Sequence, residues 1–267
     1  MIVCPLISGS SGNATYVESG DARILVDCGG AGAQIENALR AIDVDPSTLT
    51  CMLVTHSHDD HIRGLGVMSR RYRLPIFASV GTWDEIIKRD KIGHVDAKNI
   101  RVFQSAHVGD VLDFGSIAAS FFSTPHDAYD SVGYVLSDGK KRFGMATDFG
   151  HVTPGIRSSL LGCDVVLLEA NYDVDMLWKG PYPYPLKVRI AGNDGHLSNV
   201  DAGDFAVELV KSGTQTVFLG HLSEHNNTQQ IAYRTVESAI LGAGVALRQD
   251  CMVYMTRRYE PSRLIKL

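Results

Sequence analysis

The chain has 267 residues and a formal net charge of −5, with 45% apolar and 21% charged residues. This composition is ordinary for a globular protein with a core, and it excludes a disordered chain. The acidic balance also excludes a protein that coats nucleic acid over its whole surface, so a nucleic-acid substrate would have to meet a local basic patch.

The first half of the chain alternates short apolar runs with turn signals such as the Ser-Gly-Ser-Ser-Gly-Asn stretch at residues 8–13. Alternation of this kind predicts strands, and apolar residues at helical spacing predict helices. We expect helices over residues 33–42, near His61, and after residue 78. We expect strands over residues 1–7, 14–18, 23–26, 51–54, 75–78, 101–103, 117–122, 133–136 and 142–146.

The second half repeats the mixture, with buried strands expected over residues 165–168 and 217–219 and helices over residues 199–211 and 228–241. Two β-rich halves, each with helices on one side, predict two sheets packed face to face with helices outside. No linker separates the halves, so we expect a single domain over residues 1–267.

The five cysteines predict a reducing compartment, because their number is odd and no C-x-x-C pair occurs. The first thirteen residues lack the basic and apolar regions of a signal peptide, and no apolar run is long enough to cross a bilayer. We therefore expect a cytoplasmic protein without a membrane partner.

Several apolar strands run into a residue that can bind a metal or a proton. These residues are Asp27, His56, Asp148, Glu169 and His221. Strand ends are rigid, and their loops converge on one edge of a sheet. The pattern therefore predicts a polar site at that edge.

The strongest local signal is the H-x-H-x-D-H motif formed by His56, His58, Asp60 and His61. Residues i and i+2 of an extended segment point to the same side, so His56 and His58 can hold one ion. Asp60 and His61 follow where the chain turns into a helix and can hold a second. Imidazole with carboxylate favours Zn²⁺, and Mn²⁺ or iron also fit.

A site with two metals needs more ligands, and His126, Asp148 and His221 each follow an expected strand. Together with Asp27 and the H-x-H-x-D-H motif, this series resembles that of the metallo-β-lactamase superfamily over nearly the whole chain. The resemblance implies an α/β fold, the four-layered αββα sandwich of that superfamily.

The resemblance also implies a role for each residue. A first metal would be held by His56, His58 and His126, and a second by Asp60, His61 and His221. Asp148 would bridge both metals, and Asp27 would orient a ligand histidine. Asp60 is also a candidate catalytic residue. The family's β-lactamases carry a cysteine where Asp148 stands, which argues against antibiotic hydrolysis.

Two further segments resemble motifs of ribonuclease Z, in which a histidine donates a proton and a glutamate supports it. Here the pair would be His196 and Glu169. His196 would protonate the leaving oxygen of a phosphodiester. Alternatively, His196 merely precedes a helix capped by Ser198 or Asn199.

Residues 8–13, 126–128, 169–173, 180–190 and 220–224 resemble the YycJ (WalJ) branch of the superfamily, which is associated with 5′-to-3′ exonuclease action on DNA. Asp127 and Glu169 would then orient ligands. Ser10, Ser11 and Asn13 could cradle a phosphate, or simply form a hairpin turn. The basic pair Lys187 and Arg189 could bind substrate, or be a solvated helix face. Trp178, Tyr182 and Tyr184 could stack on bases or fill a gap beneath a loop.

These observations predict a hydrolase with two divalent metal ions, most simply a phosphodiesterase or nuclease acting on DNA. The resemblance implies a hydroxide shared by the two metals as nucleophile and His196 as general acid. The alternatives are a lactone or thioester hydrolase similar to glyoxalase II, which uses the same metals, and a regulatory protein with a decayed site. We assign no function to His225, and we expect His94, His107 and His151 to be structural.

Overall fold

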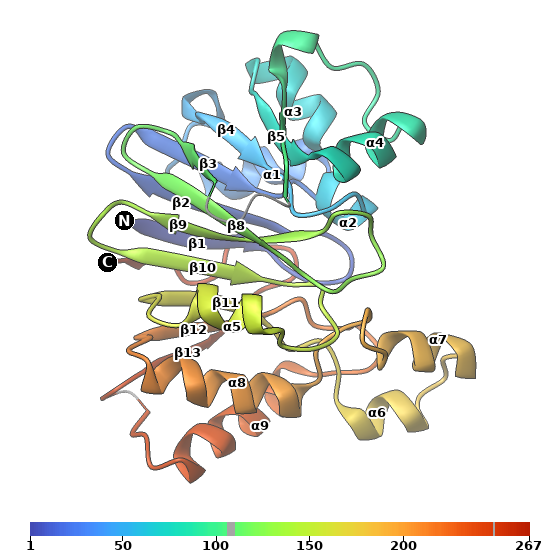
Figure 1. Cartoon of the computed structure of the whole chain (residues 1–267), viewed down its shortest axis with the longest axis vertical. Helices are drawn as coiled ribbons and strands as arrows, with labels where there is room; N and C mark the ends of the chain where they lie inside the picture. The colour runs from blue at the N-terminus through green and yellow to red at the C-terminus, as the bar shows by residue number, and fades with distance from the viewer. Residues whose placement is uncertain (106–109, 248) are drawn as a thin grey trace.

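A computed structural model describes residues 1–105, 110–247 and 249–267. Two seven-stranded sheets face each other, and helices cover their outer faces (Figure 1). The expected α/β fold, a four-layered αββα sandwich, is therefore confirmed. No helix in the described part of the chain is long and apolar enough to cross a membrane.

Each sheet is antiparallel at one end and parallel at the other. In the first sheet β14, β1, β2 and β3 are antiparallel neighbours and β3 to β6 are parallel. Its order is β14 (Ile265–Lys266), β1 (Ile2–Ile7), β2 (Ala14–Ser19), β3 (Ala22–Val26), β4 (Cys51–Leu53), β5 (Ile76–Ser79) and β6 (Ile100–Phe103).

In the second sheet β7 to β10 are antiparallel and β10 to β13 are parallel. Its order is β13 (Met252–Met255), β12 (Thr216–Gly220), β11 (Val165–Glu169), β10 (Arg142–Ala146), β9 (Val132–Ser137), β8 (Ala118–Ser123) and β7 (Val111–Asp113).

The helices form two outer layers and two smaller groups. The first sheet is covered by α1 (Gly32–Arg40), α3 (Leu65–Tyr72) and α4 (Val80–Lys88), and the second by α5 (Pro154–Leu160), α8 (Asn199–Lys211) and α9 (Gln229–Gly242). The short α2 (Asp59–Ile62) lies in the H-x-H-x-D-H loop. The remaining pair, α6 (Val174–Lys179) and α7 (Tyr184–Ile190), forms a lobe beside the sandwich (Figure 1).

The central strands are apolar on both faces because both faces are covered. Along β11, Val165 and Leu167 belong to the core between the sheets, whereas Val166 and Leu168 pack under the outer helices. This alternation follows from the two-residue period of a strand, and double burial explains why the run is continuously apolar.

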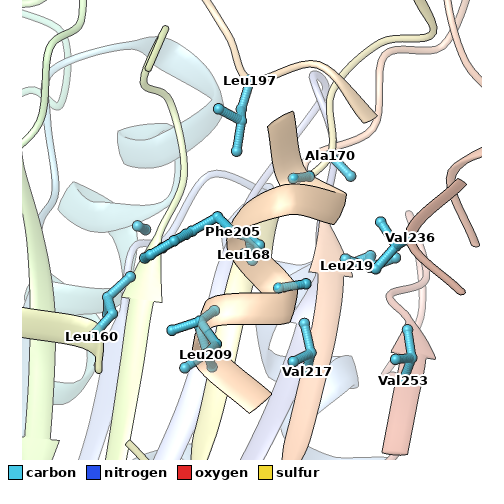
Figure 2. Close-up of a cluster of buried hydrophobic side chains, with 14 of the residues drawn as sticks. Leu160, Leu168, Ala170, Leu197, Phe205, Leu209, Val217, Leu219, Val236 and Val253 are labelled. Atoms are coloured by element: carbon cyan, nitrogen blue, oxygen red, sulfur yellow. The ribbon is translucent and has the colours of Figure 1, made fainter. Parts of the chain in front are cut away.

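Helix α8 begins at Ser198, whose side chain accepts a hydrogen bond of 3.1 Å from the Asp201 backbone N–H. Its buried face carries Phe205 and Leu209. Figure 2 shows both residues among the apolar side chains of the sheet and the neighbouring helices.

We expect Phe205→Ala to lower the free energy of unfolding by about 3–5 kcal/mol, because Phe205 is 1% exposed and its removal leaves a cavity. The control is Val200→Ala on the same helix, where the side chain is 53% exposed and the change should stay within about 0.5 kcal/mol. Urea denaturation of both variants measures the difference. Equal losses would contradict this description of α8.

The predicted strands and the helices over residues 199–211 and 228–241 are found with ends shifted by at most one residue. The sequence did not predict α5, α6, α7, β7, β13 or β14. The three helices have only six or seven residues, too few for a clear helical period, and β7 is partly exposed at the edge of its sheet.

Candidate metal centre

The strand ends converge as the sequence predicted, and the backbone there is unusual. Asp27, Asp148 and His221 each follow a strand and have left-handed φ values of 61°, 60° and 53°. Such a conformation costs a non-glycine residue about 1–3 kcal/mol and persists where surrounding structure enforces it. Aspartate and histidine tolerate it better than most residues. At the ends of their strands, Asp27 contacts His61, and Asp148 contacts His221.

Four overlapping groups of potential metal ligands lie at these strand ends. Within each group, one ligand atom per residue lies within 4.8 Å of the others. The groups are His56, His58 and His126; His56, His61 and Asp148; Asp60, His61 and His221; and Asp148, Glu169, His196 and His221. All seven residues that the sequence suggested as metal ligands are thus brought together from both sheets.

Asp148 lies between the two expected metal positions. Its Oδ2 is 3.1 Å from His61 Nε2, and its Oδ1 is 3.4 Å from His221 Nε2 and 3.8 Å from His126 Nε2. Its side chain is 2% exposed. A carboxylate with its two oxygens turned to different imidazoles can bind one ion with each.

The hydrogen bonds of the histidines fix which ring nitrogen is free. An ionised carboxylate or a carbonyl can only accept, so the Nδ1–H of His61 donates to Asp27 (2.8 Å), that of His221 to Glu169 (2.9 Å) and that of His126 to Gly195 O (3.2 Å). Nε2 is then the ring nitrogen that each of these histidines turns toward Asp148. Metal-binding histidines are held through their other nitrogen in this way.

The Nε2 atoms of His61 and His221 face carboxylate oxygens, an arrangement that suits a bound cation. His61 Nε2 and Asp148 Oδ2 are only 3.1 Å apart, yet Asp148 Oδ2 accepts no hydrogen bond within the described residues. His56 Nε2 is also buried there without a partner. Buried polar atoms are rarely left in this state, so the donor set fits divalent metal ions.

The electrostatics of the site lead to the same conclusion. Burial alone would lower the pKa of His221, but the surrounding carboxylates, Asp148 foremost, outweigh burial and raise it to about 10. Burial would likewise raise the pKa of Asp148, yet the neighbouring histidines hold it well below its usual range. The carboxylates therefore stay ionised and attract positive charge, which metal ions would supply.

Asp27 is fully buried behind the metal ligands. Besides His61, it binds Thr55, whose backbone N–H donates to Asp27 Oδ1 at 2.9 Å and whose hydroxyl lies 2.9 Å from Asp27 Oδ2. Thr55 Oγ1 also lies 3.0 Å from His56 Nδ1. Sequence reasoning missed Thr55, because only the folded loop shows that this hydroxyl links Asp27 to His56.

Glu169 holds two histidines with one oxygen. Its Oε1 lies 2.8 Å from His196 Nδ1 and 2.9 Å from His221 Nδ1, while its Oε2 accepts from the backbone N–H groups of Phe149 and Leu197 at 3.0 and 3.3 Å. Burial would raise the pKa of Glu169, but His196 foremost among its partners outweighs that effect and lowers it. Glu169 is therefore an ionised, fixed acceptor. The sequence suggested its contact with His196 and not its contact with His221.

His196 lies beside the metal ligands, with Nδ1 3.6 Å from Asp148 Oδ1. Ser198 caps the helix that follows, as the alternative explanation of this segment expected. His196 nevertheless has a partner of its own in Glu169. With Nδ1 bound to Glu169, Nε2 is the ring nitrogen of His196 that this carboxylate does not hold.

Asp127 connects the metal centre to α7. Its Oδ1 lies 3.4 Å from His126 Nε2 and 3.7 Å from His58 Nε2, and its Oδ2 binds the guanidinium of Arg189. The Arg189 side chain is 61% exposed. This places one cationic group next to the ligand histidines.

A cavity of about 210 Å³ opens beside the ligands. Its lining includes His126 and His196 from the metal centre, Arg189 from α7, and Ser10 from the loop between β1 and β2. Ser11 lies on the same loop, and its carbonyl accepts a hydrogen bond from Arg63 at 3.2 Å.

Two of the residues suggested for substrate binding have other partners. Asn13 is 3% exposed, and its amide bonds Gly9 and lies 3.1 Å from His61 Nε2, so it fixes the loop against the metal centre. Lys187 is 9% exposed and donates to the carbonyls of Trp178 and Gly180. Neither lines the cavity, and we correct both assignments to structural roles.

The histidines without a motif lie outside these ligand groups where they are described. His94 and His151 contribute to none of the four groups, and His107 lies outside the described residues. His225 is exposed and its ring contacts Tyr182 at 5.8 Å between centroids.

Comparison with known proteins gives near-complete matches. A family model described as "Beta-lactamase superfamily domain" matches residues 22–221. The chain is 35% identical to exodeoxyribonuclease WalJ of Streptococcus pneumoniae serotype 2 (strain D39 / NCTC 7466), over 94% of this chain and 92% of that protein. It is 32% identical to exodeoxyribonuclease YycJ of Bacillus anthracis, over 97% and 96%.

Other matches are partial or structural. A hydroxyacylglutathione hydrolase of Nitrobacter hamburgensis is 32% identical, but the match covers 59% of this chain and 50% of that protein. Among solved structures, the metallo-beta-lactamase fold protein YhfI from Bacillus subtilis matches with a TM-score of 0.73 and 18% identity, over 99% of this chain and 98% of that chain. That likeness supports the fold alone.

Proposed function

The chain belongs to the metallo-β-lactamase superfamily, and from this premise we propose that it is a metal-dependent hydrolase that degrades DNA as an exonuclease, in the 5′-to-3′ direction. The observation that carries the proposal is the Glu169–His196 pair, which lies beside the metal ligands where a leaving oxygen would need a proton. Relatives that match this chain over nearly their whole length carry the name exodeoxyribonuclease.

The proposed metal centre contains two divalent ions. His56, His58 and His126 would hold the first, Asp60, His61 and His221 the second, and Asp148 both. Bound there, the ions would make water nucleophilic at neutral pH and offset charge on the phosphoryl oxygens. The nitrogen-rich donor set favours Zn²⁺ as the native metal, and Mn²⁺ or iron also fit it.

The chain's own groups complete the proposed mechanism. Glu169 holds the His196 ring through Nδ1, so His196 Nε2 can donate a proton to the departing oxygen of the phosphodiester. Asp60 turns Oδ2 toward His221 Nε2 and His61 Nε2, at 3.4 and 3.6 Å, and its other oxygen would position the attacking water. Asp27 and Asp127 keep the ligand rings in place.

We also propose that residues 1–267 work as one domain in a reducing, cytoplasmic compartment. The single-domain proposal is supported by an apolar core that takes side chains from both sheets. The compartment is supported by five buried, free cysteines.

The test uses purified protein with added Zn²⁺ or Mn²⁺ and DNA labelled at either the 5′ or the 3′ end. We expect stepwise shortening of DNA, immediate release of a 5′ label, and loss of activity with a chelator that returns when metal is restored. A glutathione thioester and a lactone serve as comparison substrates. Fast hydrolysis of either one with intact DNA would overturn the proposal in favour of a small-molecule hydrolase.

A further inference from the structure

We propose that the cavity beside the metal centre is a binding site for the terminal nucleoside of a DNA strand, with Tyr182 contacting the base. This inference rests on the proposed function and specifies how that function is directed to strand ends. A nucleoside bound in a cavity next to the reactive centre would place the first phosphodiester bond of a strand at the metals.

The lining of the cavity has the mixed chemistry that a nucleoside requires. One wall consists of His126 and His196, which belong to the metal centre. Another part of the lining is apolar and aromatic, with Tyr182, Leu186 and Ile190 from the α6–α7 lobe. The polar side chains of Ser10, Asn171 and Ser223 also line the cavity and can form hydrogen bonds with the oxygen atoms of a nucleotide.

The lobe is a rigid wall because it has its own small core. Tyr172, Leu177 and Ile190 are buried together, and Tyr182 and Leu186 pack against them. The ammonium of Lys187 ties the lobe together by donating to Trp178 O at 2.8 Å and Gly180 O at 2.7 Å. A wall that is fixed before binding loses little conformational entropy when a ligand enters.

Tyr182 is held in place by a contact with another ring. Its ring meets the ring of His225 edge-on, with centroids 5.8 Å apart and an angle of 75° between the planes. This contact gives His225 a role as a positioning residue for Tyr182. Stacking between a base and an aromatic ring is tolerant of sequence, as a general exonuclease needs.

Arg189 supplies positive charge at the same cavity. Its guanidinium is bound by Asp127 and is 61% exposed, so it remains accessible to a second anion. A planar guanidinium matches the geometry of a phosphate group. Arg189 is therefore placed to bind a phosphate of the same terminal nucleotide.

The other aromatic residues of the lobe provide a matched control. Trp178 and Tyr184 are 42% and 71% exposed, and their rings pair with each other at 6.1 Å. Neither lines the cavity. Tyr184 thus differs from Tyr182 in position but not in chemistry.

The experiment compares Tyr182→Ala, Tyr182→Phe and Tyr184→Ala on two DNA substrates, one ending in a normal nucleotide and one in an abasic residue. On the normal end we expect Tyr182→Ala to raise KM about tenfold. On the abasic end the same variant should differ from wild type by less than about twofold, because the base is already missing. Tyr182→Phe and Tyr184→Ala should resemble wild type on both.

Methyl p-nitrophenyl phosphate, which has no nucleoside, reports on the metal centre alone and should be hydrolysed equally by all variants. The nucleoside site would be overturned if Tyr182→Ala raised KM equally on the normal and the abasic end. It would also be overturned if Tyr184→Ala raised KM on the normal end as much as Tyr182→Ala does. Neither result would contradict the exonuclease activity itself. A wild-type protein that hydrolyses the small ester and leaves DNA intact would instead overturn the proposed function, and the nucleoside site with it.

Discussion

Replacing Asp148 with asparagine is expected to lower turnover by at least about a thousandfold, equivalent to ~4 kcal/mol of transition-state stabilisation. Asp148 is the carboxylate whose two oxygens face His61 on one side and His221 on the other. An amide keeps the shape but has no negative charge to share between two cations. Elemental analysis of the purified variant should show less bound metal than wild type.

Asparagine is the cleaner substitution because Asp148 has a φ of 60°. Asparagine tolerates the left-handed conformation, whereas alanine would add backbone strain to the loss of charge. Asp204→Asn on the exposed side of α8 serves as the control and should match wild type. An Asp148→Asn protein with wild-type turnover and metal content would contradict the bridging role.

Replacing His196 with alanine is expected to slow DNA hydrolysis about 10²- to 10⁴-fold while the metal content stays unchanged. The reason is that His196 is held by Glu169 through Nδ1 and offers Nε2 to the substrate, whereas His61 and His126 are held by Asp27 and Gly195. His221 keeps its own contact with Glu169 when His196 is replaced. Single-turnover rates on labelled DNA measure the chemical step.

A substrate with a good leaving group separates proton donation from other roles of His196. A p-nitrophenolate leaving group departs without a proton, so the variant should hydrolyse methyl p-nitrophenyl phosphate within about tenfold of wild type. If both substrates slow equally, His196 does not act as the general acid. If the variant loses metal, His196 is a ligand, and its membership in the group with Asp148, Glu169 and His221 would explain why.

The sequence predicted the clustering of the candidate ligands because these residues are marked locally. The H-x-H-x-D-H motif and the polar residues after apolar strands can be recognised without knowing which strands are neighbours. The two-residue and helical periods likewise marked the central strands and the long helices α8 and α9, where burial makes the pattern regular.

What the sequence could not predict depends on partners that are distant along the chain. Nothing near Glu169 indicates that it also holds His221, and nothing near Lys187 indicates that its ammonium is buried against Trp178 and Gly180. A lysine in a basic pair is usually solvated and free to bind an anion. The sequence therefore suggested substrate binding for Lys187, whereas its ammonium has a structural role. The α6–α7 lobe was missed as helices because its two segments are short, yet it forms a wall of the cavity.

The division of the metal ligands between the two sheets has a consequence for biosynthesis. Asp60 and His61 follow a strand of the first sheet, whereas Asp148 and His221 follow strands of the second. A nascent chain exposes the first set long before His221 leaves the ribosome. The full set of candidate ligands can therefore assemble only after His221 has been synthesised and the two sheets have docked.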